Sequence, residues 1–261
     1  MDGQRPRRRP EAFVRATLSL GDGALRAAYV ASVVREWEVP VLAQVLDQVC
    51  ERAEQAETDA REVLVALVDA LNVEGMDDVV QRLREEAAGR SLLALERLIR
   101  HPVRVGRAEA ASRADRVPFD GRGRPLTLGE RKSLARRPDR DLMQRLMLDP
   151  HPDVIHRLLR NPRVLEDDVV RLAAKRPGRG GVLAVIARST KWVHRPRVRM
   201  ALVLNPRTPL EIAARIAGLL LRPELELVAG SPHVPPAVRA LCVEHLDRRP
   251  PVERPGDEGL H

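Results

Sequence analysis

Few residues of this sequence have the types and spacing that chemistry requires. His151 and His156 flank Asp153, but they are five positions apart, whereas two metal ligands on one helical face are typically four apart. The sequence contains no GxxxxGK[ST], HExxH, GxSxG, CxxC or HRD-type motif. We therefore predict turn and surface histidines, no metal or cofactor, and a protein that is not an enzyme.

Two further patterns have both a chemical and a structural interpretation. The glycine-rich residues 178–181 precede an apolar helix and could place backbone N–H groups around a phosphate. A dinucleotide-binding glycine motif follows a strand, however, and here a helix comes first. Asp167 and Asp168 are neighbouring carboxylates, but their side chains diverge by about 100° on a helix. We predict a turn at the glycines and a helix start stabilised by the two aspartates.

A basic stretch is the strongest indication of a binding function. Residues 169–210 contain ten Lys and Arg residues and no Asp or Glu. The densest part supplies the candidate partner-binding residues, here named the basic stripe: Arg188, Lys191, Trp192, Arg195, Arg197 and Arg199. If these side chains share one face, they can bind an acidic protein surface or the phosphates of a nucleic acid.

The composition leaves alternatives open for this stripe. The chain has 42 Arg but only three Lys, as a GC-rich coding bias would produce, so many arginines could simply be exposed. Trp192 is either a plug in an irregular repeat, which we favour, or a platform for a base. Binders of single-stranded nucleic acid generally use several aromatic residues. We therefore predict a protein partner, with nucleic-acid binding as the alternative.

Proline breaks organise the part of the chain that carries this stretch. Asp149-Pro150 and Asn161-Pro162 are 12 residues apart, and each should end one helix and begin a turn. The apolar spacing that follows predicts a helix over 165–176, and Thr127 with Glu130 predicts a capping box at a helix start. The Asn-Pro-Arg frame recurs 44 residues later at Asn205. This self-similarity favours short helices that bury their apolar faces against their neighbours.

At these breaks the sequence resembles a known repeat family. The frames Asp-Pro-x-Pro-Asp-Val, from Asp149, and Asn-Pro-Arg-Thr-Pro, from Asn205, resemble the leucine-rich repeat variant and, more loosely, HEAT-type repeats. The run 125–246 is also similar to a group of bacterial helical-repeat proteins. The likeness implies an α-solenoid of short stacked helices and transfers no site. The chain departs from the pattern at Leu165, where a capping Thr is expected, and over residues 178–200.

The first hundred residues differ from the rest in charge. Residues 1–10 carry a net charge of +3, residues 11–100 carry −7 and residues 101–261 carry +12. Residues 11–100 could extend the solenoid or form a separate helical subdomain, and the change of charge favours the subdomain. The helices that we predict in this region are 11–18, 22–37, 40–56, 59–72 and 76–100, the last with a break at Gly89.

The remaining expectations concern domain boundaries and location. We predict a disordered basic tail over 1–10, a linker over 101–126, a repeat domain over 127–247 and a disordered tail over 248–261. No stretch is long and apolar enough to span a membrane. Cys50 and Cys242 are expected to be free buried thiols, which predicts a reducing, cytoplasmic location. The repeat and the lack of catalytic motifs predict a scaffold that mediates protein–protein interaction.

Overall fold

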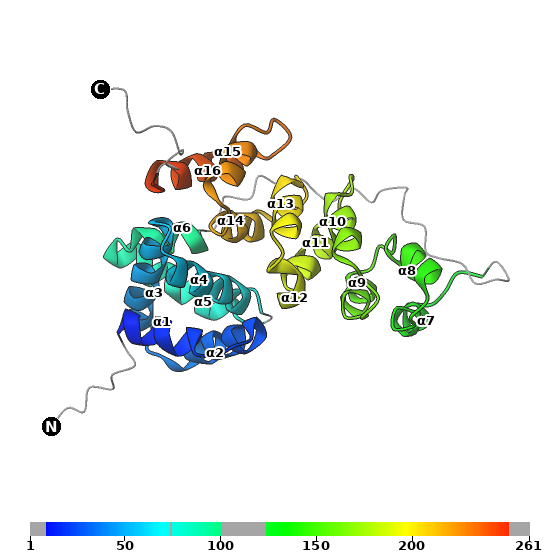
Figure 1. The fold of residues 1–261 in the computed structure, drawn as a ribbon, viewed down its shortest axis with the longest axis horizontal. Helices are drawn as coiled ribbons and strands as arrows, with labels where there is room; N and C mark the ends of the chain where they lie inside the picture. Colours follow the sequence, from blue (N-terminus) through cyan, green and yellow to red (C-terminus); the bar gives the residue numbers. More distant parts are fainter. Residues whose placement is uncertain (1–8, 74, 101–123, 251–261) are drawn as a thin grey trace. The chain divides into compact units, whose positions relative to one another are not determined.

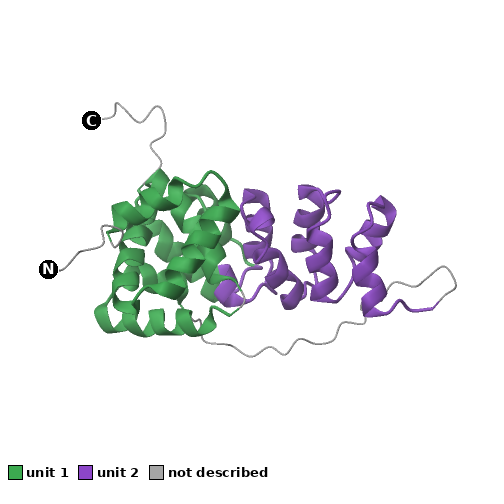
Figure 2. Ribbon diagram, turned by 90° about the horizontal axis from the view of Figure 1, so that it is seen from below, with its two compact units in different colours: residues 1–100, 214–232, 236–261 green, residues 101–213, 233–235 purple. Residues whose placement is uncertain are grey.

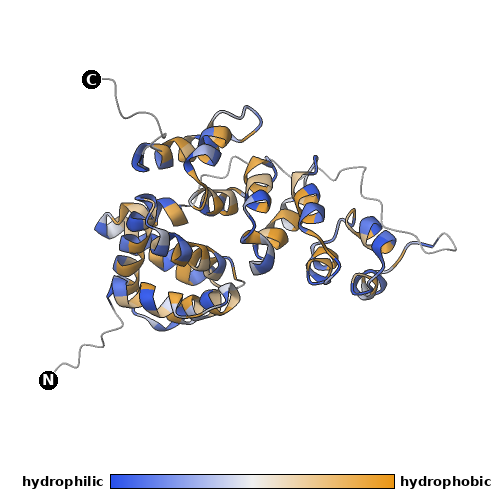
Figure 3. Ribbon diagram, viewed as in Figure 1, coloured by the Kyte–Doolittle hydropathy of each residue, from blue (hydrophilic) through white to orange (hydrophobic). Residues whose placement is uncertain are grey.

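The computed structural model describes residues 9–73, 75–100 and 124–250, which form sixteen α-helices and no β-strand (Figure 1). The predicted all-α class is confirmed. Hydrophobic and hydrophilic residues alternate along the helices (Figure 3), so the helices have apolar sides to bury. The predicted tails and the predicted linker lie mostly outside the described residues.

The first six helices match the predicted segments to within two residues at their outer ends. They are α1 (Pro10–Leu18), α2 (Gly23–Glu36), α3 (Val39–Glu54), α4 (Thr58–Leu71), α5 (Asp77–Arg90) and α6 (Leu93–Ile99). The last predicted segment is two helices, because Ser91 adopts a left-handed φ of 55° that an α-helix cannot continue. The break therefore falls two residues after Gly89, which lies inside α5.

Two compact units divide the chain, and Figure 2 shows them in different colours. Unit 1 comprises residues 1–100, 214–232 and 236–261, and unit 2 comprises residues 101–213 and 233–235. The segment predicted as one repeat domain is thus shared between the units. Its C-terminal part contributes the end of α14 (Leu210–Ala217), α15 (Arg222–Ala229) and α16 (Pro236–Arg248) to unit 1.

Aliphatic side chains build the core of unit 1, as the composition predicts. Helix α4 packs against α1, α2 and α3, and α3 also packs against α5 and α6. Leu42 and Leu67 are fully buried there. Three of the five aromatic residues gather at the edge of this core, where the Phe13 ring centroid lies 6.4 Å from Tyr29 and 6.0 Å from Trp37.

Buried arginines bind backbone carbonyl groups in unit 1. Arg215, at the end of α14, donates to Leu71 O at 3.0 Å, at the C-terminus of α4. Arg249, just after α16, donates to Gly218 O at 2.8 Å and also to Leu220 O. The last four carbonyl groups of a helix have no partner within the helix, so Arg215 supplies a donor at the end of α4, whereas Arg249 binds carbonyl groups of the turn between α14 and α15. The bond from Arg215 attaches the C-terminal segment of unit 1 to its N-terminal helices.

A buried ion pair lies beside a buried histidine in the same unit. Arg97 Nε donates to Glu54 Oε1 at 2.8 Å, and the two side chains are 4% and 9% exposed. His245 Nδ1 lies 3.8 Å from the same oxygen, and neither ring nitrogen of this buried residue has a hydrogen-bond partner among the described residues. Burial, with the nearby charges of Arg249 and Arg97, lowers the pKa of His245 to about 4.

Short helices separated by the proline breaks make up unit 2. Before α14 they are α7 (Leu128–Leu134), α8 (Arg140–Leu146), α9 (Pro152–Leu159), α10 (Glu166–Ala174), α11 (Gly180–Ala187), α12 (Thr190–Val193) and α13 (Pro196–Leu204). Helix α10 confirms the predicted helix over 165–176. Helix α9 packs against α7 and α11, and α10 packs against α13. The predicted capping box is present at α7, where Glu130 N donates to Thr127 Oγ1 at 3.3 Å and Thr127 N donates to Glu130 Oε2 at 2.7 Å.

The two asparagines of the Asn-Pro breaks join non-adjacent helices. Asn161 Nδ2 donates to two carbonyl oxygens at the end of α7, at 3.0 and 2.9 Å. Asn205 Nδ2 does the same at the end of α10, at 2.7 and 3.1 Å. Each amide oxygen also accepts the backbone N–H two residues later, from Arg163 and Arg207, at 3.0 Å. One side chain thus fixes a turn and binds the open end of another helix.

Other residue types serve the remaining breaks of unit 2. At Asp149 the carboxylate accepts the His151 N–H at 2.9 Å and binds Arg131 Nη1 at 2.6 and 2.7 Å. At the irregular part of the repeat, Trp192 Nε1 donates to Leu159 O at 2.9 Å, at the end of α9. The ends of α7, α9 and α10 are therefore each bound by a polar side chain from a later part of the unit.

Asn205→Ala should lower the free energy of unfolding by about 2 to 4 kcal/mol, because it leaves buried carbonyl groups without a donor. Urea unfolding followed by far-UV circular dichroism measures the change. Arg163→Ala is the control, since that side chain is exposed and makes no hydrogen bond within the described part of the chain. Unfolding of Asn205→Ala at the wild-type urea concentration would contradict this role.

The free energy of unfolding should also fall as the pH decreases from about 6.5 to about 4. Above this range His245 is neutral in both the folded and the unfolded chain. Within it, the unfolded chain binds a proton that the folded protein does not, so the loss reaches about 3 kcal/mol near pH 4. Chemical unfolding at several pH values measures the loss. His245→Leu should remove this part of the pH dependence, and an unchanged slope in the variant would refute the assignment.

Candidate protein-interaction surface

The residues of the basic stripe lie on the last helices of unit 2. Arg188 follows α11, Lys191 and Trp192 belong to α12, and Arg195 precedes α13. Arg197 and Arg199 lie in the first turn of α13. The exposed members are Arg188, Lys191, Arg195 and Arg197, whereas Arg199 is half-buried and Trp192 is buried.

Trp192 is part of the interior of unit 2. Its side chain is 3% exposed, and its indole N–H binds Leu159 O. Lys191 Nζ lies 4.3 Å from the indole ring centroid, which is the distance of a cation–π contact. The indole therefore has the position that the plug interpretation expects, and it has no open face on which a nucleotide base could stack.

Two arginines of the stripe face acidic residues at the start of α10. Arg197 Nη1 lies 2.6 Å from Asp167 Oδ1, and Arg195 Nε lies 4.0 Å from Glu166 Oε2. These acids come 30 and 29 residues earlier in the chain, and the packing of α13 against α10 brings them to the stripe. The acid-free stretch of sequence is therefore not an acid-free surface.

The other chemical candidates have structural roles. His151 precedes α9, and its Nδ1 accepts the Asp153 N–H at 3.2 Å, which confirms the predicted turn histidine. Gly178 lies against Asn205, where a Cβ atom would come within 2.9 Å of the amide nitrogen, so close packing requires this glycine. Among residues 9–73, 75–100 and 124–250, no group of three or more His, Cys, Asp or Glu side chains could hold a metal ion.

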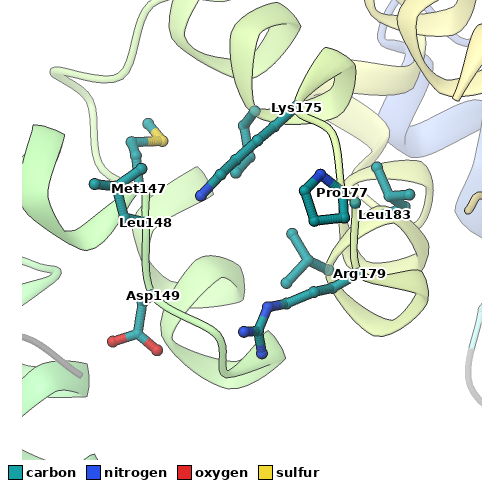
Figure 4. Close-up of a pocket in the computed structure, with 10 residues that line it drawn as sticks. Met147, Leu148, Asp149, Lys175, Pro177, Arg179 and Leu183 are labelled. Carbon is teal, nitrogen blue, oxygen red and sulfur yellow. The ribbon is translucent and has the colours of Figure 1, made fainter. Parts of the chain in front are cut away.

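An open pocket between α8 and α10 was not predicted from the sequence. Its volume is about 340 Å³, and it is lined by Gln144, Met147, Leu148, Asp168, Arg171, Leu172 and Lys175. A smaller pocket of about 30 Å³ continues it toward α11 and adds Asp149, Pro177, Gly178, Arg179, Val182 and Leu183 (Figure 4). We name the two together the α8–α10 groove.

One face of each helix forms the walls of this groove. On α10 and its C-terminal end, the lining residues follow at intervals of three and four positions from Asp168 to Lys175, the period of one helical face. On α8 and the turn after it, Gln144, Met147 and Leu148 follow the same spacing. Each half of the pattern is visible in the sequence. The sequence does not show that the two faces lie opposite each other, because this arrangement depends on packing between helices.

The carboxylates that line the groove are already paired. Asp168 accepts Arg140 Nη2 at 2.7 Å, Arg171 Nη2 at 2.6 Å and the Leu165 N–H at 3.0 Å. Its pKa is lowered to about 2, chiefly by Arg140 and less by Leu165 N–H and Arg171, against the opposing effect of burial. Asp149 is paired with Arg131 deep in unit 2.

Lys175 distinguishes the groove electrostatically. Its side chain is exposed and has no acidic partner among the described residues. Figure 4 shows the charged ends of Lys175 and Arg179 extending over the pocket. Since the carboxylates are neutralised by other arginines, the groove presents an apolar floor and a positively charged rim.

Asp168→Ala should lower the unfolding free energy by about 2 to 3 kcal/mol, because the 4% exposed carboxylate binds two arginines and the N–H of Leu165, the N-cap residue of α10. Asp167→Ala is the matched control, since the neighbouring ion pair with Arg197 is more than half exposed on both sides and should contribute close to nothing. Thermal unfolding compares the two. Equal losses of stability in the two variants would show that the buried Asp168 network contributes no more than the exposed ion pair.

Comparisons with known proteins identified no relative of this chain. No protein-family model, no curated protein and no solved structure matches the chain. Within the described residues, no helix has both the length and the apolar character needed to cross a membrane.

Proposed function

We propose that unit 2 is a leucine-rich repeat variant or HEAT-like α-solenoid and that the protein is a non-enzymatic scaffold that binds an acidic partner protein. The solenoid part is supported by the packing of α9 against α7 and α11, and of α10 against α13. It is also supported by the repeated use of a polar side chain at a break to bind an earlier helix end. Repeat proteins of this kind bind partners along extended surfaces.

The observation that carries the binding proposal is the separation of charge between the units. Residues 101–213 contain 25 Lys and Arg against 12 Asp and Glu, a net charge of +13, whereas the remainder of the chain has a net charge of −5. Arg188 and Lys175 are exposed and have no acidic partner among the described residues. Such a surface attracts acidic partners and raises their association rates.

A nucleic acid is the second candidate, because its phosphates would satisfy the same charge. Three observations favour a protein. Trp192, the only aromatic residue between positions 124 and 213, is buried. Arg195 and Arg197 already face acids. The α8–α10 groove has an apolar floor, which suits side chains of a protein better than a phosphate backbone.

The predicted cytoplasmic location belongs to the same proposal. Cys50 and Cys242 are buried and unpaired in the structure, as the sequence predicts. Burial raises the pKa of the Cys242 thiol to about 12, so this thiol stays protonated and unreactive near neutral pH. Unpaired thiols are usual in a reducing compartment.

The proposal is tested by comparing protein and DNA binding across a salt series. The immobilised chain should recover an acidic protein from a cell lysate at low salt and release it as the salt concentration rises. Random-sequence duplex DNA should bind weakly even at about 50 mM salt. DNA binding that is tight at about 50 mM and falls by orders of magnitude by about 200 mM would support the nucleic-acid alternative instead. Repeated recovery of no protein would contradict the scaffold proposal.

A further inference from the structure

The α8–α10 groove contains an apolar surface that unit 2 leaves uncovered. Leu148 is 58% exposed, although it lies between the buried residues Leu146 and Asp149. Met147, Leu172 and Leu183 extend the apolar lining from Leu148 toward α11. Covering such a leucine with another aliphatic side chain is favourable, because the contact removes apolar area from water.

The positive charge at the rim of the groove favours a ligand that carries negative charge. Lys175 is a cation without an acidic partner in the described part of the chain, and Arg171, 69% exposed, still has guanidinium surface open to solvent beside its bond to Asp168. Both carboxylates that line the groove are neutralised, since Asp149 and Asp168 each bind an arginine. An anionic group at this rim therefore meets net positive charge without repulsion.

Apolar floor and cationic rim together select one class of occupant. A bare phosphate would leave Leu148 uncovered, and an uncharged apolar ligand would leave Lys175 without an anionic partner. A peptide segment with an aliphatic side chain next to carboxylates satisfies both parts, and the groove is open enough for such a segment to reach its lining residues.

We propose that the α8–α10 groove binds an extended acidic segment of a partner protein. An aliphatic side chain of that segment packs on Leu148 and Leu172, and a neighbouring Asp or Glu pairs with Lys175. The inference rests on the proposed scaffold function and assigns its binding site to residues other than those of the basic stripe.

Peptide display tests the chemistry of the groove while the partner protein is still unidentified. A library of random twelve-residue peptides on phage is selected against the immobilised full-length protein. The enriched peptides should combine Asp or Glu with Leu, Ile or Val. A synthetic peptide of the enriched sequence should bind in fluorescence anisotropy, and replacement of its acids by the corresponding amides should weaken binding at least about 10-fold. Enrichment of basic peptides, or of none, would overturn the proposal.

Matched variants locate the site. Leu148→Glu and Lys175→Glu should each weaken binding of the selected peptide at least about 10-fold, and Lys175→Arg should retain it. Leu165→Glu is the control for the first, because Leu165 is equally exposed at 58% but does not line the groove. Arg163→Glu is the control for the second, because Arg163 is exposed, has no acidic partner among the described residues and does not line the groove. The four residues changed are all exposed, so unchanged circular dichroism is expected for every variant.

The outcomes separate the groove from the scaffold proposal. If the lysate partner is recovered equally by the wild type and by Leu148→Glu/Lys175→Glu, the groove assignment is wrong and the scaffold proposal stands. If neither a lysate protein nor a peptide binds, both are wrong. Enriched peptides that match an acidic segment of this chain, together with concentration-dependent self-association in analytical ultracentrifugation, would replace the partner protein by a second copy.

Discussion

The structure depends on supplying hydrogen-bond donors to the carbonyl groups at the ends of many short helices. Unit 2 uses helices of four to nine residues, and every helix leaves its last four carbonyl groups without an internal partner. Where these carbonyl groups are buried, water cannot donate a hydrogen bond to them, and a missing donor lowers the free energy of unfolding by about 1 to 3 kcal/mol. Asn161, Trp192 and Asn205 provide the donors in unit 2. Because each donor comes from a later part of the unit than its acceptor, the same bonds hold separate parts of the unit together.

In unit 1, arginine side chains donate hydrogen bonds to buried carbonyl groups. The high arginine content therefore reflects structural roles as well as any binding surface. Arg215 binds a helix-end carbonyl group, and Arg249 binds carbonyl groups of the turn between α14 and α15. Arg97 and Arg131 form buried ion pairs in units 1 and 2, respectively. A guanidinium group offers five N–H donors in a plane, so one side chain can reach several carbonyl or carboxylate oxygens. A high count of arginines therefore does not measure a nucleic-acid surface in this protein. The cations relevant to binding are those that remain exposed and unpaired, of which Lys175 is one.

The same breaks that require these donors also create the α8–α10 groove. The turn before Pro150 ends α8 and leaves Leu148 exposed, while Asp149 turns inward to bind Arg131. On the opposite wall, Asp168 holds Arg140 and Arg171 and starts α10. The groove walls are thus fixed by the buried polar network, and the exposed residues Leu148 and Lys175 on them are not part of that network. This division is the physical basis for expecting substitutions of Leu148 and Lys175 to change binding and not folding.

Local physical chemistry in the sequence determined the helices: apolar periodicity, the proline breaks and the Thr127 capping box gave the all-α class and most helix ends. The plug interpretation of Trp192 was also available, because a lone tryptophan in an irregular repeat has few other roles. Only the tertiary structure decided which charges face each other. Glu166 and Asp167 face Arg195 and Arg197 because α13 packs against α10. Leu148 and Lys175, which follow α8 and α10, line the same groove. Helix formation depends on neighbours within four positions, whereas a surface depends on contacts between residues some thirty positions apart, which periodicity does not encode.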